Sequence, residues 1–222
     1  MLDLAEQPDI VPKIRRRGRP VQSVDQSLSE DVMLALAFHS FAERGFEGTT
    51  VRELAKQLGV SHNLINVRFG RKDELWKRAV DWRLRRASSL VTSAFDSGND
   101  PEMRLRDLVR RFCLWATENP DIVALAHLEG NRGTWRLDHI VESFILPFKQ
   151  RLDTLIAAVA AVRPVGNIST AALLALLVQG VGYYFSATPL QERIGAGDEV
   201  APVNFNRQAG LMAEFLLSGL LP

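Results

Sequence analysis

The stretch GTTVRELAKQLGVSHNLINVRFGRKDEL, residues 48–75, decides the fold of the N-terminal part of the chain. Within it, Thr50 and Glu53 form a Ser/Thr-x-x-Glu pattern, which satisfies the free backbone donors at the start of a helix. Gly59 provides a stop for that helix, and Ser61 provides an N-cap for a second one. Two short helices joined by a tight, glycine-containing turn predict a helix-turn-helix, a motif that many DNA-binding domains use.

The sequence on both sides of this stretch has apolar residues at helical spacing. Leu34, Phe38 and Phe41 recur at i, i+4 and i+7, and Gly45 ends the pattern. After Gly70 we expect a long connecting helix, followed by helices over residues 101–119, 121–129, 134–162, 169–187 and 204–220. Because strand-like alternation is absent, the sequence predicts an all-α protein.

We divide the chain into three parts on this basis. Residues 1–26 lack sustained periodicity and are interpreted as a flexible basic arm. Residues 27–72 are interpreted as the three-helix DNA-binding domain, and residues 73–222 as a C-terminal helical domain for regulation and dimerisation. Residues 1–86 carry 16 Lys and Arg against 12 Asp and Glu, whereas residues 87–222 carry 11 against 14. This asymmetry indicates a polyanionic partner for the N-terminal part.

Composition narrows the class of protein. With 222 residues, of which 46% are hydrophobic, the chain can bury a sizeable core. The lone Cys113 cannot form an internal disulfide and no Cys/His group has zinc-site spacing, so we expect no metal, no cofactor and a reducing, cytoplasmic location. We expect no export signal and no membrane span, since the most apolar run, residues 171–185, is short. The sequence contains no phosphate loop, HExxH pair or nucleophile elbow, so we expect that the protein is not an enzyme.

The second short helix of the motif offers side chains that suit base edges in the major groove. Asn pairs bidentately with adenine, and aliphatic side chains contact a thymine methyl group. The candidates for base reading are His62, Asn63, Leu64, Asn66 and Val67, while Ile65 and Phe69 are expected to face the core. The candidates for phosphate contact are Thr49, Thr50, Ser61, Arg68, Arg71 and Lys72. Thr50 has a simpler interpretation as a helix cap only, and Arg71 as a solvated loop residue.

The arm contains a second pattern, RRRGRP, formed by Arg15, Arg16, Arg17, Gly18, Arg19 and Pro20. Its core, RGRP, resembles an AT-hook, in which extended arginines flanking a glycine enter the narrow minor groove of A·T-rich DNA. The alternative interpretation is a solvated basic tail, whose affinity for DNA comes from counterion release alone.

Residues 30–80 resemble the DNA-binding domain of the TetR family of bacterial transcriptional regulators. The resemblance rests on FAERGFEGTTVRELAKQLGVSHNLINVRFGRKDELWKRAV, residues 41–80, with its aromatic-Ala-x-x-Gly helix end and the elements TTVRELA, GVS and GRKDEL. It implies an all-helical homodimer that binds a palindromic operator and usually represses until a small molecule enters the C-terminal domain. Asn63 and Asn66 stand where the family commonly has Gly and Tyr, whereas Lys72 retains a lysine that contacts phosphate.

The C-terminal part offers candidates for an effector pocket and for a dimer interface. Eight side chains suit an apolar pocket with a few polar groups: Phe112, Trp115, His127, Trp135, Phe144, Phe148, Tyr183 and Tyr184. Ordinary core packing explains the same composition. The resemblance places a homodimer interface at the helices near 169–187 and 204–220, and an internal core is the alternative there. The competing function is an architectural protein that binds A·T-rich DNA without an effector.

Overall fold

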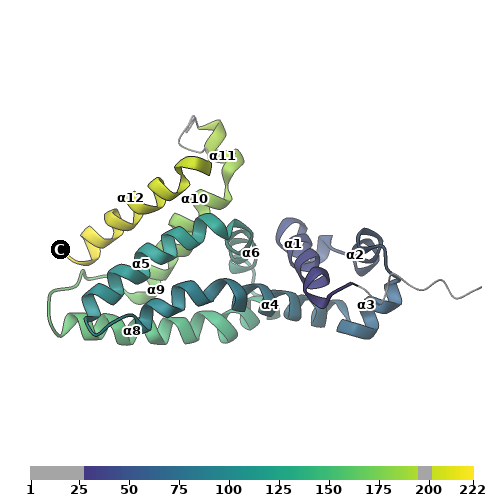
Figure 1. Ribbon diagram of the computed structural model, residues 1–222, viewed down its shortest axis with the longest axis horizontal. Coiled ribbons are helices and arrows are strands. Elements are labelled where there is room, and N and C mark those ends of the chain that lie inside the picture. The colour runs from purple at the N-terminus through teal and green to yellow at the C-terminus, as the bar shows by residue number, and fades with distance from the viewer. Residues whose placement is uncertain (1–27, 195–201) are drawn as a thin grey trace, which may run out of the picture.

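The computed structural model describes residues 28–194 and 202–222, so the predicted arm and its RRRGRP segment lie outside the described residues. Within those two ranges every regular element is a helix, which confirms the predicted all-α fold. Figure 1 shows two lobes joined along α4 (Lys72–Thr92). The N-terminal lobe consists of α1 (Glu30–Gly48), α2 (Val51–Leu58) and α3 (His62–Phe69), and the C-terminal lobe consists of the helices after α4.

Side-chain caps start both helices of the helix-turn-helix. The Thr50 hydroxyl accepts from the Glu53 backbone N–H at 3.2 Å and donates to the Glu53 carboxylate at 3.0 Å. The Ser61 hydroxyl accepts from the Leu64 backbone N–H at 3.2 Å. Each cap satisfies a donor that the first turn of a helix leaves free, so the predicted helix starts are confirmed.

The turn between α2 and α3 depends on a glycine in the left-handed conformation. Gly59 has φ 67° and ψ 26°, where a side chain would be strained. The Val60 N–H donates to the Ala55 carbonyl at 3.0 Å, and the Gly59 N–H donates to the Lys56 carbonyl at 3.3 Å. These bonds satisfy the last carbonyls of α2 and turn the chain into α3, so the predicted helix-turn-helix is confirmed.

Gly45 interrupts α1 where the sequence predicts its end. Its φ of 74° and ψ of 173° take the chain out of the helical conformation before Phe46. A Cβ built on Gly45 would lie 3.3 Å from Cδ2 of Leu128 in α6 (Pro120–Gly130). The glycine therefore allows both the turn and the close approach of α1 to the C-terminal lobe.

One apolar cluster holds the N-terminal lobe on α4. Phe38 and Phe41 of α1, Ile65 of α3 and Trp76 of α4 are buried together. The same cluster includes three side chains from the C-terminal lobe, Ile122, Leu125 and Ile140. The C-terminal lobe thus completes the core of the N-terminal lobe.

The C-terminal lobe is arranged around α5 (Pro101–Glu118), which packs against α4 and against helices from later in the chain. The short helix η2 (Ser93–Asp96) precedes it. Burial raises the pKa of the Cys113 thiol in α5 to about 12. No helix within residues 28–194 and 202–222 combines the length and apolar character that crossing a membrane demands. The later helices are α7 (Trp135–Ile140), α8 (Leu146–Ala160), α9 (Thr170–Ala175), α10 (Tyr183–Ser186), α11 (Thr188–Arg193) and α12 (Pro202–Leu220).

The helical run predicted over residues 134–162 contains a wider turn. The π-helix η3 (Val141–Ile145) joins α7 to α8 without a break. Pro147 follows it; this residue has no N–H to donate to the Ser143 carbonyl, and its ring crowds that carbonyl. Widening the preceding turn relieves the crowding, which gives a physical reason for η3.

The run predicted over residues 169–187 also contains a π-helix, η4 (Leu176–Gly182), between α9 and α10. Gly182 lies against Val123 of α6, and a Cβ built on Gly182 would approach Val123 Cγ1 to 2.9 Å. The sequence pattern did not predict the short helix α11 that follows.

Candidate nucleic-acid interface

Helix α3 has one face in the core and one face in solvent. Ile65 and Phe69 are buried, as predicted, and anchor the helix. His62, Asn63 and Asn66 are exposed, and Val67 has 74% of its surface exposed although it is apolar. Leu64 is half-buried and packs against the core of the N-terminal lobe. The structure therefore brings four of the five predicted base-reading side chains to the outer face and turns Leu64 partly inward.

Two of these exposed side chains contact each other. Asn66 Nδ2 lies 3.2 Å from His62 Nδ1, one helical turn earlier. When Nδ1 carries no proton, it accepts from the amide N–H, and the imidazole keeps an N–H donor at Nε2. The pair then presents the imidazole N–H and the Asn66 carbonyl oxygen, a donor and an acceptor that suit base edges in the major groove.

The burial of Thr49 removes this residue from the predicted set of phosphate contacts. Its side chain is fully buried, and its hydroxyl lies 2.9 Å from the Ser40 carbonyl and 2.9 Å from the Gly45 carbonyl. A hydroxyl enclosed in this way has no surface to offer a phosphate. Its structural effect is to tie the end of α1 to the start of α2.

Thr50 and Ser61 are exposed N-cap residues, each directly before the first residue of α2 or α3. Their hydroxyls cap these helices, so each lies beside backbone N–H groups at the positive end of a helix dipole. Such ends suit an anion, and both residues remain candidates for phosphate contact.

The three predicted cations have different surroundings. Arg68 Nη1 donates to the Leu28 carbonyl at 2.9 Å and lies 3.6 Å from Met33 Sδ, which places its guanidinium between α3 and the start of the described chain. Arg71 has 88% of its side chain exposed and lies 3.5 Å from Asp73. The Lys72 ammonium lies at the start of α4, over the ring of Phe46. Arg71 is therefore the most exposed of the three, whereas Arg68 and Lys72 are both half-buried.

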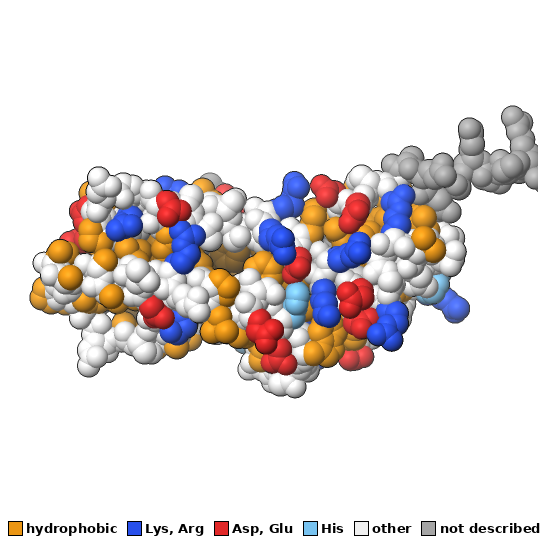
Figure 2. Space-filling view, turned by 90° about the horizontal axis from the view of Figure 1, so that it is seen from below, with side chains coloured by type: hydrophobic (Ala, Val, Ile, Leu, Met, Phe, Trp, Pro, Cys, Tyr) orange, Lys and Arg blue, Asp and Glu red, His pale blue; other side chains and the backbone are white. Residues whose placement is uncertain are grey.

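Sequence reasoning missed a further cation at this end of the molecule. Arg78 of α4 is exposed, donates to the Arg68 carbonyl at 3.2 Å and lies over the Phe69 ring. Nothing in the sequence distinguishes it from the solvated arginines farther along the same helix. Figure 2 shows Lys and Arg side chains mixed with Asp and Glu over the N-terminal lobe, so the face in this view has no uniformly basic surface.

The side chains predicted to line one ligand pocket lie in separate places, which corrects that prediction. Phe112, Trp115, Phe148 and Tyr184 pack with the core of the C-terminal lobe. His127 and Tyr183 lie together at the surface, with ring centroids 5.0 Å apart. His127 Nδ1 is 2.8 Å from Gln179 Oε1. Trp135 and Phe144 pack against the N-terminal lobe. Core packing, the alternative interpretation, accounts for most of the set.

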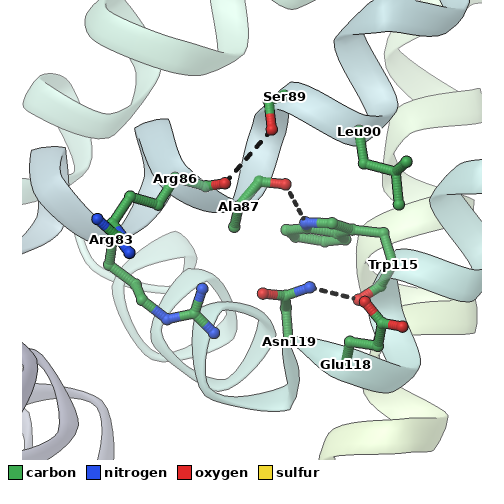
Figure 3. A pocket seen from close by; sticks show the side chains of 8 residues that line it. All are labelled: Arg83, Arg86, Ala87, Ser89, Leu90, Trp115, Glu118 and Asn119. Atoms are coloured by element: carbon green, nitrogen blue, oxygen red, sulfur yellow. Dashed lines mark hydrogen bonds between the residues drawn. The ribbon is translucent and has the colours of Figure 1, made fainter.

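Trp115 borders a hollow between α4 and the α5–α6 turn. The hollow measures about 280 Å³, and Figure 3 shows the side chains around it. The indole N–H of Trp115 donates to the Ala87 carbonyl of α4 at 2.9 Å, and the Asn119 amide donates to the Trp115 carbonyl at 2.7 Å. On the α4 side, Arg83 pairs with Asp121 of α6 through two contacts of 2.8 and 3.0 Å. This hollow therefore borders the contacts that fix α4 to the C-terminal lobe.

A second hollow of about 350 Å³ lies where α4 meets α7. Trp135 and His139 border it, and His139 Nε2 is 2.8 Å from Asp81 Oδ1. Within the described parts of the chain, no group of three or more His, Cys, Asp and Glu side chains is arranged to hold a metal ion.

Comparisons with known proteins agree with this arrangement. Residues 33–79 match the family model described as bacterial regulatory proteins, tetR family. A comparison with curated proteins finds no match. Three similar solved structures are a HlyIIR mutant, a tetR-family regulatory protein from Rhodococcus RHA1, and the transcriptional regulator FadR from Bacillus subtilis in complex with stearoyl-CoA.

These similarities extend over most of each chain at low sequence identity. HlyIIR is 21% identical with a TM-score of 0.64, covering 86% of this chain and 95% of that one. The Rhodococcus protein is 16% identical with a TM-score of 0.65, covering 87% and 98%. FadR is 12% identical with a TM-score of 0.64, covering 86% and 100%. At such identities the structures show a shared fold.

The fold and the exposed face of α3 define a helix-turn-helix domain followed by a helical C-terminal lobe. Residues 33–79 resemble the tetR family of bacterial regulatory proteins, and the fold of 86–87% of the chain is similar to the folds of HlyIIR and of the Rhodococcus tetR-family protein.

Proposed function

We propose that this chain is a cytoplasmic repressor that binds a pseudo-palindromic operator as a homodimer and is released by a small-molecule effector. The observation that carries the proposal is the outer face of α3, where His62, Asn63, Asn66 and Val67 are exposed on a helix anchored by buried residues. We assign base reading to this face, and phosphate contact to Thr50, Ser61, Arg71 and Lys72.

Unpartnered apolar surface on α12 supports a homodimer. Ala213 and Leu217 of α12 are buried within the chain. Phe215, on another face, has 79% of its surface exposed, and Leu211 is exposed beside it. Leu176 and Gly180 of η4 are exposed as well. A helix that is apolar on an inner and an outer face suits burial on both sides, as in a bundle formed with a second copy of the chain.

The contacts of α4 support regulation through this helix. Arg83 and Ala87 bind the C-terminal lobe, and the Trp82 indole donates to Asp31 of α1 at 2.9 Å. An effector in the C-terminal lobe would displace α4 and change the spacing of the two α3 helices in the dimer. A coupling of about 1–3 kcal/mol would change operator affinity roughly 5–150-fold. The stearoyl-CoA complex of FadR supports the proposal that this fold accommodates a small-molecule effector.

The first test is selection of operator sequences from a random DNA pool with the full chain, in parallel with a chain lacking residues 1–20. A two-fold-symmetric motif is the expected result, because a symmetric dimer reads two equivalent half-sites. Loss of an A·T flank on truncation would assign RRRGRP to the minor groove. Diffuse A·T enrichment without a palindrome would instead favour the architectural function.

A further inference from the structure

One aromatic ring lies between the two ends of the helix-turn-helix. Phe46 precedes the start of α2, and Lys72 begins α4 just after α3. The Lys72 ammonium lies over the Phe46 ring, 4.3 Å from its centroid. The ring face attracts a cation, so Phe46 restricts the position of the ammonium while leaving N–H groups for another acceptor.

The C-terminal lobe reaches the same ring. Arg136 of α7 places its guanidinium carbon 4.7 Å from the Phe46 centroid, and Trp135 meets Phe46 edge to face at 5.6 Å. Two cations from different lobes therefore share one ring. A displacement of Arg136 therefore changes the electrostatic field at the ring that holds the Lys72 ammonium.

Arg136 is itself held by a buried ion pair. Its Nε lies 2.9 and 3.0 Å from the two carboxylate oxygens of Glu129, which is fully buried, and Arg136 is 5% exposed. The Glu47 carboxylate at the end of α1 lies 3.9 Å from the guanidinium. Separating a buried pair leaves an uncompensated charge, so Arg136 moves with Glu129 and the α6–α7 turn as one unit.

The same junction contains an unsatisfied donor. Trp76 is fully buried, its indole N–H has no hydrogen-bond partner among the described residues, and its ring meets Trp135 edge to face at 5.2 Å. An unpaired buried donor raises the free energy of this arrangement.

We propose that Phe46 and Arg136 are positioning residues for Lys72, through which the C-terminal lobe controls how Lys72 meets a DNA phosphate. The inference rests on the proposed function, because Lys72 contacts phosphate only if α3 binds DNA. It adds a second connection between the lobes, from the α6–α7 turn to the start of α4. Arg136 thus affects DNA binding although it is buried.

The decisive measurement is a double-mutant cycle between Phe46→Leu and Lys72→Gln, read as operator affinity across a salt series with the full chain. Lys72→Gln should weaken binding and lower the salt slope by about one. Phe46→Leu should weaken binding about threefold to tenfold in the wild-type background and have no further effect beside Lys72→Gln. Additive effects of the two substitutions would overturn the inference.

Lys77→Gln is the matched control. Lys77 lies on the same helix and over a ring of the same junction, 5.5 Å from the Trp135 centroid. Its effect should add to that of Phe46→Leu, because Lys77 does not share the Phe46 ring. A cycle with Lys77 that is as non-additive as the cycle with Lys72 would mean that Phe46→Leu acts through general disruption of the junction.

Arg136 is tested by removing both buried charges together, as Glu129→Leu with Arg136→Met, because neither charge is then left alone. This variant should weaken operator binding in the wild-type background and not beside Lys72→Gln. Wild-type affinity and salt slope would overturn the role of Arg136. If the charge-free variant does not fold, Phe46→Leu and the measurement below still decide the proposal.

A measurement without DNA separates this inference from the proposed function. The ring current of Phe46 should shift the NMR signals of the Lys72 ε-methylene protons, and Phe46→Leu should abolish that shift. The charge-free variant should alter it as well. Unchanged Lys72 signals in both variants would overturn the positioning role. The expected changes, in a protein that binds no DNA, would refute the proposed function and the phosphate contact of Lys72, but not the positioning of Lys72 by Phe46 and Arg136.

Discussion

At position 66 of α3 an amide lies beside an imidazole, and under the proposed function this contact governs which groups Asn66 presents to a base. Because His62 Nδ1 lies 3.2 Å from Asn66 Nδ2, His62→Ala frees the amide to rotate. We expect His62→Ala to reduce the preference for one base pair by up to about tenfold, measured against single-base operator variants. Asn66→Ala should remove that preference in either background. An effect of His62→Ala that persists beside Asn66→Ala would contradict the pairing.

Thr49 and Thr50 are adjacent threonines with opposite environments, one buried and one exposed. Thr49→Val removes the hydroxyl that lies 2.9 Å from two buried carbonyls and should lower the free energy of unfolding by about 1–3 kcal/mol, measured by urea denaturation. Thr49→Ser keeps the hydroxyl and serves as the control. Native stability together with weakened DNA binding in Thr49→Val would restore the phosphate role.

The contact between η4 and α6 shows how elements depend on a single missing side chain. A Cβ at position 182 would approach the two Val123 methyl groups to 2.9 and 3.0 Å. Gly182 lies in η4 and Val123 lies in α6, and both helices are packed in the C-terminal lobe. Gly182→Ala should therefore destabilise the protein by about 1–3 kcal/mol in urea denaturation. Adding Val123→Ala should recover part of that loss, because it removes the clashing atoms. Strictly additive losses would show that steric overlap is not the cause.

At the scale of the whole molecule, the exposed apolar face of α12 is the feature that a single chain leaves uncovered. Phe215→Glu places a charge in the proposed dimer interface and should yield monomers in sedimentation velocity. Operator affinity should fall by more than about a hundredfold, since one half-site contact is then lost. Val162→Glu, at another exposed apolar position, is the control and should leave the dimer intact. A dimeric Phe215→Glu protein would exclude α12 from the interface.

Local chemistry explains which features were predictable from the sequence. Thr50, Gly59 and Ser61 act on backbone groups within a few residues, so their spacing alone predicts the helix-turn-helix. Helical periodicity likewise predicts the later helices, because one turn repeats the same environment. The π-helices and Gly182 depend on neighbours outside that repeat, and their details were not predicted.

Roles that depend on contacts with residues distant in the sequence were predicted less well than the helix caps and turns. Arg68 is a surface cation by sequence, yet its guanidinium binds the carbonyl of a residue 40 positions earlier. Trp135 was expected in a ligand pocket, but packs between Phe46 and Trp76 at the junction of the lobes. The sequence pattern around an aromatic residue does not distinguish a place in the core from one in a ligand pocket or at a junction between lobes.

By itself, the sequence determined an all-helical chain with a capped helix-turn-helix and an outward polar face on α3, because caps, turns and amphipathic periodicity act over short distances. Only the tertiary structure decided that Thr49 is enclosed, that Arg68 turns back toward Leu28, and that Arg136 shares the Phe46 ring with Lys72. These outcomes depend on contacts between residues far apart in the chain. The local sequence around a side chain does not predict which distant residue will pack against it.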